Sequence, residues 1–187
     1  MATKAKQPVA VPDPRAIFRL AEGFRDAADV LNSHDVREKT HATSESPTYD
    51  SAAMLVVDAL AVELYLKCLY VLDHKREPPF KHPFDVLFYK LTSETQSAVR
   101  RRFDINNNHI VLRLFRQENP SAPPLFDFAA FLKVASDTFT RMRYAYEATN
   151  KLPKGWFFWS GPRDALRDTI LIRYTVSELW GKPGRTE

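Results

Sequence analysis

The sequence is poor in glycine. Five of its 187 residues are glycine, against an average share of roughly 7%. None lies between Gly23 and Gly155. The central part of the chain therefore cannot supply the glycine-rich turn that cradles a phosphate or a dinucleotide at the start of a helix. Asn-Gly, Asp-Gly and Gly-Gly pairs are also absent, which argues against a protein of many β-hairpins, because tight hairpin turns favour these pairs.

Cysteine is just as scarce. Cys68 is the only one, which excludes an internal disulfide and a multi-cysteine zinc site and fits a reducing compartment. The first residues carry no apolar segment of a secretory signal, so we expect a cytoplasmic protein. We expect four histidines to lie in loops: His34, His41, His74 and His82. None of them forms a metal-ligand pattern with a neighbouring carboxylate or thiol. We therefore expect neither a metal nor another cofactor.

The chain also lacks an uninterrupted hydrophobic run of membrane-spanning length. The most apolar stretch, 52–72, contains Asp58, Glu63 and Lys67, and each charge costs about 2.5–3.5 kcal/mol near the centre of a bilayer. We therefore expect no contact with a membrane. Apolar side chains surround this stretch on all sides, which predicts a buried central helix at about 48–73.

Proline, capping residues and helical periodicity mark further helices. Asp13-Pro14 is typical of a helix start and predicts a helix at about 14–32. A polar loop to residue 47 follows, with or without a turn of helix in it. The core side of the 14–32 helix would carry Ile17, Leu20, Ala21, Phe24, Ala28 and Leu31. We also expect a short helix at 83–91, a helix opened by a Ser93/Gln96 capping box and interrupted at 106–108, a long helix capped by Asp127, and a last helix at about 162–179.

These elements predict an all-α protein, an up-and-down bundle of five or six helices around the 48–73 helix. We expect a single domain over 13–180, with a disordered N-terminal tail at 1–12 and a C-terminal tail at 181–187. The net charge is +4, and residues 100–116 contain five arginines but only one acidic residue. This local excess of positive charge permits an anionic partner.

Three strings in the sequence resemble one family pattern. Residues 61–69 (AVELYLKCL), 82–88 (HPFDVLF) and 143–147 (RYAYE) are similar to the "AxELxLKxL … HDLxxL … RYxYE" pattern of HEPN-like proteins (higher eukaryotes and prokaryotes nucleotide-binding domain). The resemblance extends over about 14–179. It implies a helical bundle that often forms a homodimer and often belongs to a bacterial defence or toxin–antitoxin system, whose active members are metal-independent ribonucleases.

The signature of those ribonucleases is an arginine followed, after four to six residues, by a histidine. Arg102 and His109 fit this spacing, although Phe103 stands where the family usually has a polar residue. Arginine can hold a phosphate, and histidine can move the proton of a ribose 2′-hydroxyl. The alternative is a basic helix face followed by a histidine in a turn.

The third string suggests a second candidate site. Arg143, Glu147 and Asn150 share one helix face, and Tyr144 belongs to the same string. They form either an anion-binding group or an intrahelical ion pair. If Asn150 stood in the place of the catalytic histidine, the protein would bind without cleaving, because an amide cannot act as a general base.

Glu63 and Lys67 lie four residues apart on the central helix. Charges on a buried helix need partners, so we expect these two to pair and one of them to reach the Arg143/Glu147 face. The pair has either a structural or a catalytic role.

Two functions follow from these patterns. The first is a catalytically silent HEPN-like module that dimerises and associates with RNA, a nucleotide or a partner protein. The second is a metal-independent endoribonuclease that uses an arginine and a histidine. The imperfect signature favours the first.

Overall fold

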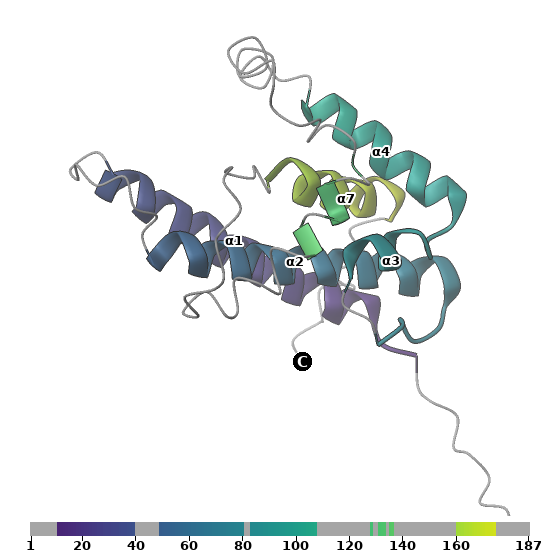
Figure 1. Ribbon diagram of the computed structural model, residues 1–187. Coiled ribbons are helices and arrows are strands. Elements are labelled where there is room, and N and C mark those ends of the chain that lie inside the picture. Colours follow the sequence, from purple (N-terminus) through teal and green to yellow (C-terminus); the bar gives the residue numbers. More distant parts are fainter. Residues whose placement is uncertain are drawn as a thin grey trace, which may run out of the picture.

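The computed structural model describes residues 11–39, 49–80, 83–107, 128, 131–133, 135–136 and 160–174. Every secondary-structure element in this part of the chain is a helix, which confirms the all-α bundle (Figure 1). The tails expected at 1–12 and 181–187 lie outside the described residues, except for residues 11 and 12.

Helices α1 (Pro14–Lys39) and α2 (Tyr49–His74) form a long antiparallel hairpin (Figure 1). The Cys68 thiol near the end of α2 donates to the carbonyl oxygen of Pro14 at the start of α1, at 3.4 Å. One turn further along α1, the ring of Phe18 lies 6.0 Å from that of Tyr65. These contacts fix the register of the hairpin.

The start of α1 is as predicted, but its end is not. The Asp13 carboxylate accepts a hydrogen bond from the Arg15 N–H at 3.0 Å, which is a side-chain cap. The helix then continues to Lys39, so the polar loop does not begin at residue 33 and His34 is helical. Ser33 does not break the helix, because its hydroxyl donates to the Asp29 carbonyl within it, at 2.8 Å.

The core side of α1 also differs from the prediction, which included Leu20 and did not include Phe18. Phe18, Ala21 and Ala28 are fully buried, whereas the Leu20 residue is 54% exposed. Successive residues turn by about 100° around a helix, so Leu20 lies on nearly the opposite side from Phe18. Because Phe18 packs against α2, Leu20 faces away from the core.

Helix α2 is the buried centre of the bundle, as expected. Its buried side chains occupy more than half of the helix circumference and include Ala59, Ala61, Val62, Tyr65, Leu66, Cys68, Leu69 and Val71. His74 is the last residue of α2, and its Nε2 lies 2.8 Å from the carbonyl oxygen of Lys90, so the expectation of a loop position was wrong. Lys75 follows with a φ of 52°, a left-handed conformation in which glycine is usual at a helix end.

Helices α3 (Phe84–Phe88) and α4 (Ser93–Asn107) follow. Helix α3 ends three residues before the predicted residue 91. The cap of α4 lies one residue earlier than predicted, because the Thr92 hydroxyl accepts the N–H of Thr95 at 3.3 Å. The described part of α4 ends at Asn107, inside the segment expected to interrupt it.

Helix α7 (Ser160–Arg173) lies between α4 and the α1–α2 hairpin (Figure 1). It begins two residues before the predicted start. It ends at Arg173, so Tyr174 is not helical, although the prediction extended the helix to residue 179. Phe128 packs between α3 and α4 in the core. Its ring lies 4.9 Å from Phe88 and 5.2 Å from Phe103. Phe131 and Ala135, expected in the helix capped by Asp127, are helical and buried.

Candidate functional site

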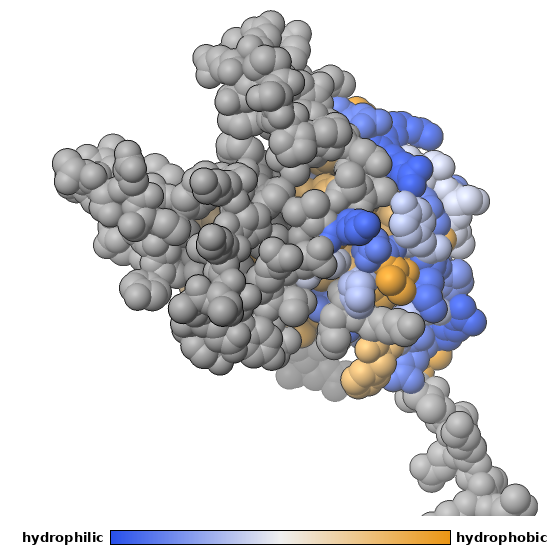
Figure 2. Space-filling view, in the orientation of Figure 1, coloured by the Kyte–Doolittle hydropathy of each residue, from blue (hydrophilic) through white to orange (hydrophobic). Residues whose placement is uncertain are grey.

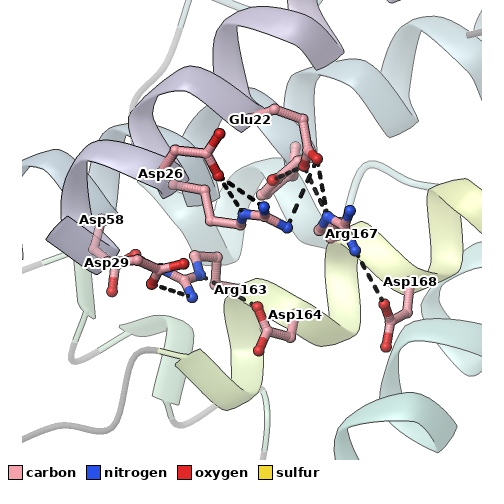
Figure 3. A network of polar contacts seen from close by, with 10 residues as sticks. Glu22, Asp26, Asp29, Asp58, Arg163, Asp164, Arg167 and Asp168 are labelled. Atoms are coloured by element: carbon pink, nitrogen blue, oxygen red, sulfur yellow. Dashed lines mark hydrogen bonds and ion pairs between the residues drawn. The ribbon is translucent and has the colours of Figure 1, made fainter. Parts of the chain in front are cut away.

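A polar network joins α7 to the α1–α2 hairpin (Figure 3). At one end of it, the Arg163 residue is only 5% exposed. Its Nη1 lies 2.8 Å from Asp58 Oδ1, and its Nη2 lies 2.9 Å from Asp29 Oδ1. Its Nε lies 3.3 Å from Asp164 Oδ1. One guanidinium therefore contacts carboxylates from α1, α2 and α7.

The environment of this group keeps it charged. Burial disfavours the charged guanidinium, but the charges of Asp58, Asp164 and Asp29 outweigh this effect and raise the pKa of Arg163. Burial raises the pKa of Asp58 above its usual value, while the charge and hydrogen bond of Arg163 act in the opposite direction. The pair is thus a buried ion pair, whose members depend on each other.

Glu22 is the centre of the other end of the network. It accepts hydrogen bonds from Arg167 Nε, at 2.9 and 3.1 Å, and from the Tyr65 hydroxyl. Arg25 Nη1 lies 3.7 Å from the same carboxylate. Burial and the hydrogen bond to Glu22 raise the pKa of Tyr65, so the phenol remains a neutral donor.

The composition of the network indicates a structural role. Carboxylates outnumber guanidinium groups, since three arginines meet six acidic residues: Glu22, Asp26, Asp29, Asp58, Asp164 and Asp168. An incoming phosphate would compete for Arg163 with the buried Asp58 carboxylate, which would lose its partner at a high energetic cost. These arginines hold α7 in place and are poorly suited to bind an anion.

A second polar cluster holds the start of α4 against the end of α2. The Asp73 side chain is 2% exposed. It accepts the Thr92 N–H at 3.0 Å and the Thr95 hydroxyl at 2.7 Å. Arg173 is the last residue of α7. Its Nη1 lies 3.6 Å from Asp73 Oδ1 and donates a hydrogen bond to the Thr95 hydroxyl. Every arginine of α7 is therefore bound to acidic residues.

The arginines of α4 have a different environment. Thr95, Val99 and Phe103 form the buried side of this helix, while Arg100 and Arg101 are exposed and Arg102 is half-buried. We call these three consecutive arginines the α4 arginine face, although at about 100° per residue Arg100 and Arg102 lie on opposite flanks of α4, with Arg101 between them. None of the three forms an ion pair with a residue that the structure describes. Most of the surface of α4 seen in Figure 2 is hydrophilic, although Ile105 of the same helix is 54% exposed.

One contact orients this face. The guanidinium carbon of Arg100 lies 5.5 Å from the centroid of the Phe88 ring, a cation–π contact that does not itself use the N–H groups of the side chain as hydrogen-bond donors. The α4 arginine face combines three consecutive cations without an ion pair to a described residue, which makes it a candidate site for an anion.

The structure describes only part of the predicted ribonuclease signature. Arg102 lies on α4 as expected. Phe103 is 2% exposed and packs against Phe128, which explains why a polar residue does not occupy this position. His109 lies outside the described residues, and so do Arg143, Tyr144, Glu147 and Asn150. Both predicted sites therefore include residues that the structure does not describe, and both stay predictions.

The predicted pair on α2 is confirmed. Lys67 Nζ lies 2.6 Å from Glu63 Oε1, and the Glu63 residue is 5% exposed. The predicted link from this pair to Arg143 and Glu147 falls on residues that the structure does not describe.

Sequence reasoning missed most of the network around α7. The apolar surroundings of Asp58 indicated that it needs a partner, but the partner, Arg163, is 105 residues away. A usable signal was present in the last helix, where Arg163-Asp164 and Arg167-Asp168 repeat four residues apart and so lie on one side of the helix.

Other kinds of site are not found in the described residues. Among them, no three histidine, cysteine or acidic side chains are grouped so that they could bind a metal ion. No helix within the described ranges combines the length and apolar character needed to cross a membrane. No protein-family model, curated protein or solved structure matches the chain.

Proposed function

We propose that this chain is an RNA-associated helical module, which binds the RNA backbone through the α4 arginine face. One observation carries the proposal: the described arginines of α7 are bound to carboxylates, whereas Arg100, Arg101 and Arg102 form no ion pair with a described residue. Arginine binds phosphate through several N–H donors at once. The resemblance to HEPN-like proteins supports RNA as the anionic ligand and a bacterial defence or toxin–antitoxin system as the setting.

The proposal includes two further expectations from the sequence. The protein acts in the cytoplasm, as the single cysteine favours, and it forms a homodimer, as the resemblance implies. A partner protein is the alternative ligand of the module. Binding through arginine side chains also agrees with the absence of a glycine-rich phosphate loop between Gly23 and Gly155.

The salt dependence of RNA binding tests this proposal. Each phosphate contact with a single strand contributes about 0.7 to the slope of log K against log salt concentration. The double variant Arg100→Gln/Arg101→Gln should therefore reduce the slope by about 1.4 and weaken binding most at low salt. Fluorescence anisotropy with a labelled single-stranded RNA measures both effects.

A matched control removes the same charge elsewhere. Arg15 and Lys75 are exposed residues outside α4, and Arg15→Gln/Lys75→Gln should change the slope much less. Equal effects of the two double variants would mean that net charge, and not the α4 arginine face, determines binding. An absence of salt-dependent RNA binding would leave the partner-protein function.

The ribonuclease alternative uses Arg102, which belongs to the same face, together with His109. It predicts RNA cleavage in the presence of a metal chelator, lost in His109→Ala while the helical circular dichroism spectrum stays unchanged. Binding without cleavage in the wild-type protein would support the silent module.

A further inference from the structure

We infer that the outward side of α1 is the homodimer interface, where a second copy of α1 packs antiparallel to the first. This inference rests on the homodimer of the proposed function and names the surface that forms it.

The outward side of α1 has an apolar pattern of its own. Ala16, Leu20, Gly23, Ala27 and Val30 are all exposed and follow one another at spacings of four, three, four and three residues, which is the repeat of a helix–helix seam. Leu20 is 54% and Val30 68% exposed. We call these five residues the α1 seam. It lies on the side of α1 away from the buried Phe18 and Ala21.

The sizes of the seam residues fit an antiparallel pair centred on Gly23. In that arrangement Leu20 faces Ala27 of the second copy, and Val30 faces Ala16. The two Gly23 residues meet at the twofold axis, where the lack of side chains lets the helices approach closely. Each large side chain thus opposes a small one, as interdigitated packing requires.

The charges beside the seam fit the same arrangement. Arg19 and Asp26 lie on one flank of the seam, seven residues apart, so in an antiparallel pair Arg19 of each copy lies beside Asp26 of the other. Arg19 forms no ion pair with a described residue. The Asp26 side chain is 65% exposed and uses its Oδ1 for Arg25, which leaves Oδ2 accessible. A parallel pair would place Arg19 beside Phe24 and lose this complementarity.

The length of the seam sets the expected strength of the dimer. From residue 16 to residue 30 a helix rises by about 21 Å. Such a contact is smaller than the interface of about 1,600 Å² that is typical of stable complexes. We therefore expect a reversible dimer whose dissociation is visible at protein concentrations of roughly 1 to 100 µM.

Gly23→Gln separates the interface from the fold. A Cβ atom added at Gly23 would meet nothing within 4 Å, and glycine is an unfavourable residue inside a helix, so the variant should fold at least as well as the wild type. Its side chain would keep two α1 helices apart. Sedimentation velocity should show a dimer dissociation constant raised by at least about 10-fold, while Ser97→Gln on exposed α4 leaves it unchanged.

A charge reversal tests the orientation. Asp26→Arg would place an arginine beside Arg19 of the other copy in both contacts of this flank and should weaken the dimer about 3-fold or more. Adding Arg19→Asp to this variant should restore the dimer, because both ion pairs then form again with the positions of the acidic and basic residues exchanged.

The outcomes separate the inference from the proposed function. A protein that stays monomeric at all concentrations overturns both the homodimer and the α1 seam. A dimer that Gly23→Gln leaves intact, or a double reversal that fails to restore binding, overturns the antiparallel α1 seam alone. The RNA-binding proposal stands or falls with its own salt-dependence experiment.

Discussion

Cys68 shows how the fold controls a single reactive group. The thiol is buried in α2, donates to the Pro14 carbonyl, and has its pKa raised from 9.0 to about 12 by burial and by the charge of Asp13. The thiolate is the reactive form of cysteine. The side chain is therefore an inert part of the core, as its apolar neighbours in the sequence indicate.

The reactivity of Cys68 can be predicted from this shift. At pH 9 about half of the thiols in the unfolded chain are ionised, but only about one in a thousand in the folded protein. Alkylation by iodoacetamide should therefore be about 500-fold slower in the native protein than in denaturant. Comparable rates in both conditions would show that the thiol is accessible.

The same shift has a consequence for stability. Because the folded-state pKa is the higher one, the contribution of Cys68 to stability is complete below pH 9 and is lost as the pH rises toward 12. Cys68→Ala should lack this component of the alkaline loss of stability.

At the scale of elements, the position of α7 depends on a few ion pairs of unequal burial. Arg163 and Asp58 have side chains that are 6% and 7% exposed, whereas the Arg167 side chain is 27% exposed. Removing one member of a buried pair leaves the other charged and unsolvated. Removing a member of a partly exposed pair lets water replace it.

The two arginines of α7 should therefore differ in importance. Arg163→Met should lower the free energy of unfolding by about 3–5 kcal/mol, and Arg167→Met by about 1 kcal/mol or less. Urea unfolding followed by circular dichroism measures both values. The double variant Asp58→Leu/Arg163→Met should be more stable than Arg163→Met alone, because no buried charge remains. Similar losses for both arginines would contradict this explanation.

On the scale of the whole molecule, the two proposed surfaces lie on different helices. Helix α7 lies between α4 and the hairpin that contains α1 (Figure 1). The α4 arginine face and the α1 seam share no residue. The proposed α1 contact therefore uses no residue of the α4 arginine face.

This separation predicts independent loss of the two activities. Gly23→Gln should weaken the dimer at least about 10-fold but keep the salt slope of RNA binding to each protomer. The double variant Arg100→Gln/Arg101→Gln should reduce the slope and keep the dimer. Anisotropy at protein concentrations above the dimer dissociation constant of the wild type, combined with sedimentation velocity, checks both variants. Loss of RNA binding in the Gly23 variant under those conditions would mean that the RNA site needs both copies.

The sequence alone determined the features that depend on neighbouring residues. The Asp13-Pro14 start of α1, the buried central helix, the pairing of Glu63 with Lys67 and the inert Cys68 were all predictable. A helix cap, an i,i+4 pair and an apolar run act over a few residues, so composition and spacing suffice to recognise them.

Only the tertiary structure decided which surfaces meet. Phe18 and Leu20 are both apolar residues of α1, and the packing on α2 decided that Phe18 is core while Leu20 is exposed. The sequence indicated that Asp58 needs a partner, but the partner is Arg163 because α7 lies beside α2 in the folded chain. Burial and charge pairing between distant helices depend on how the helices pack, and local sequence does not contain that information.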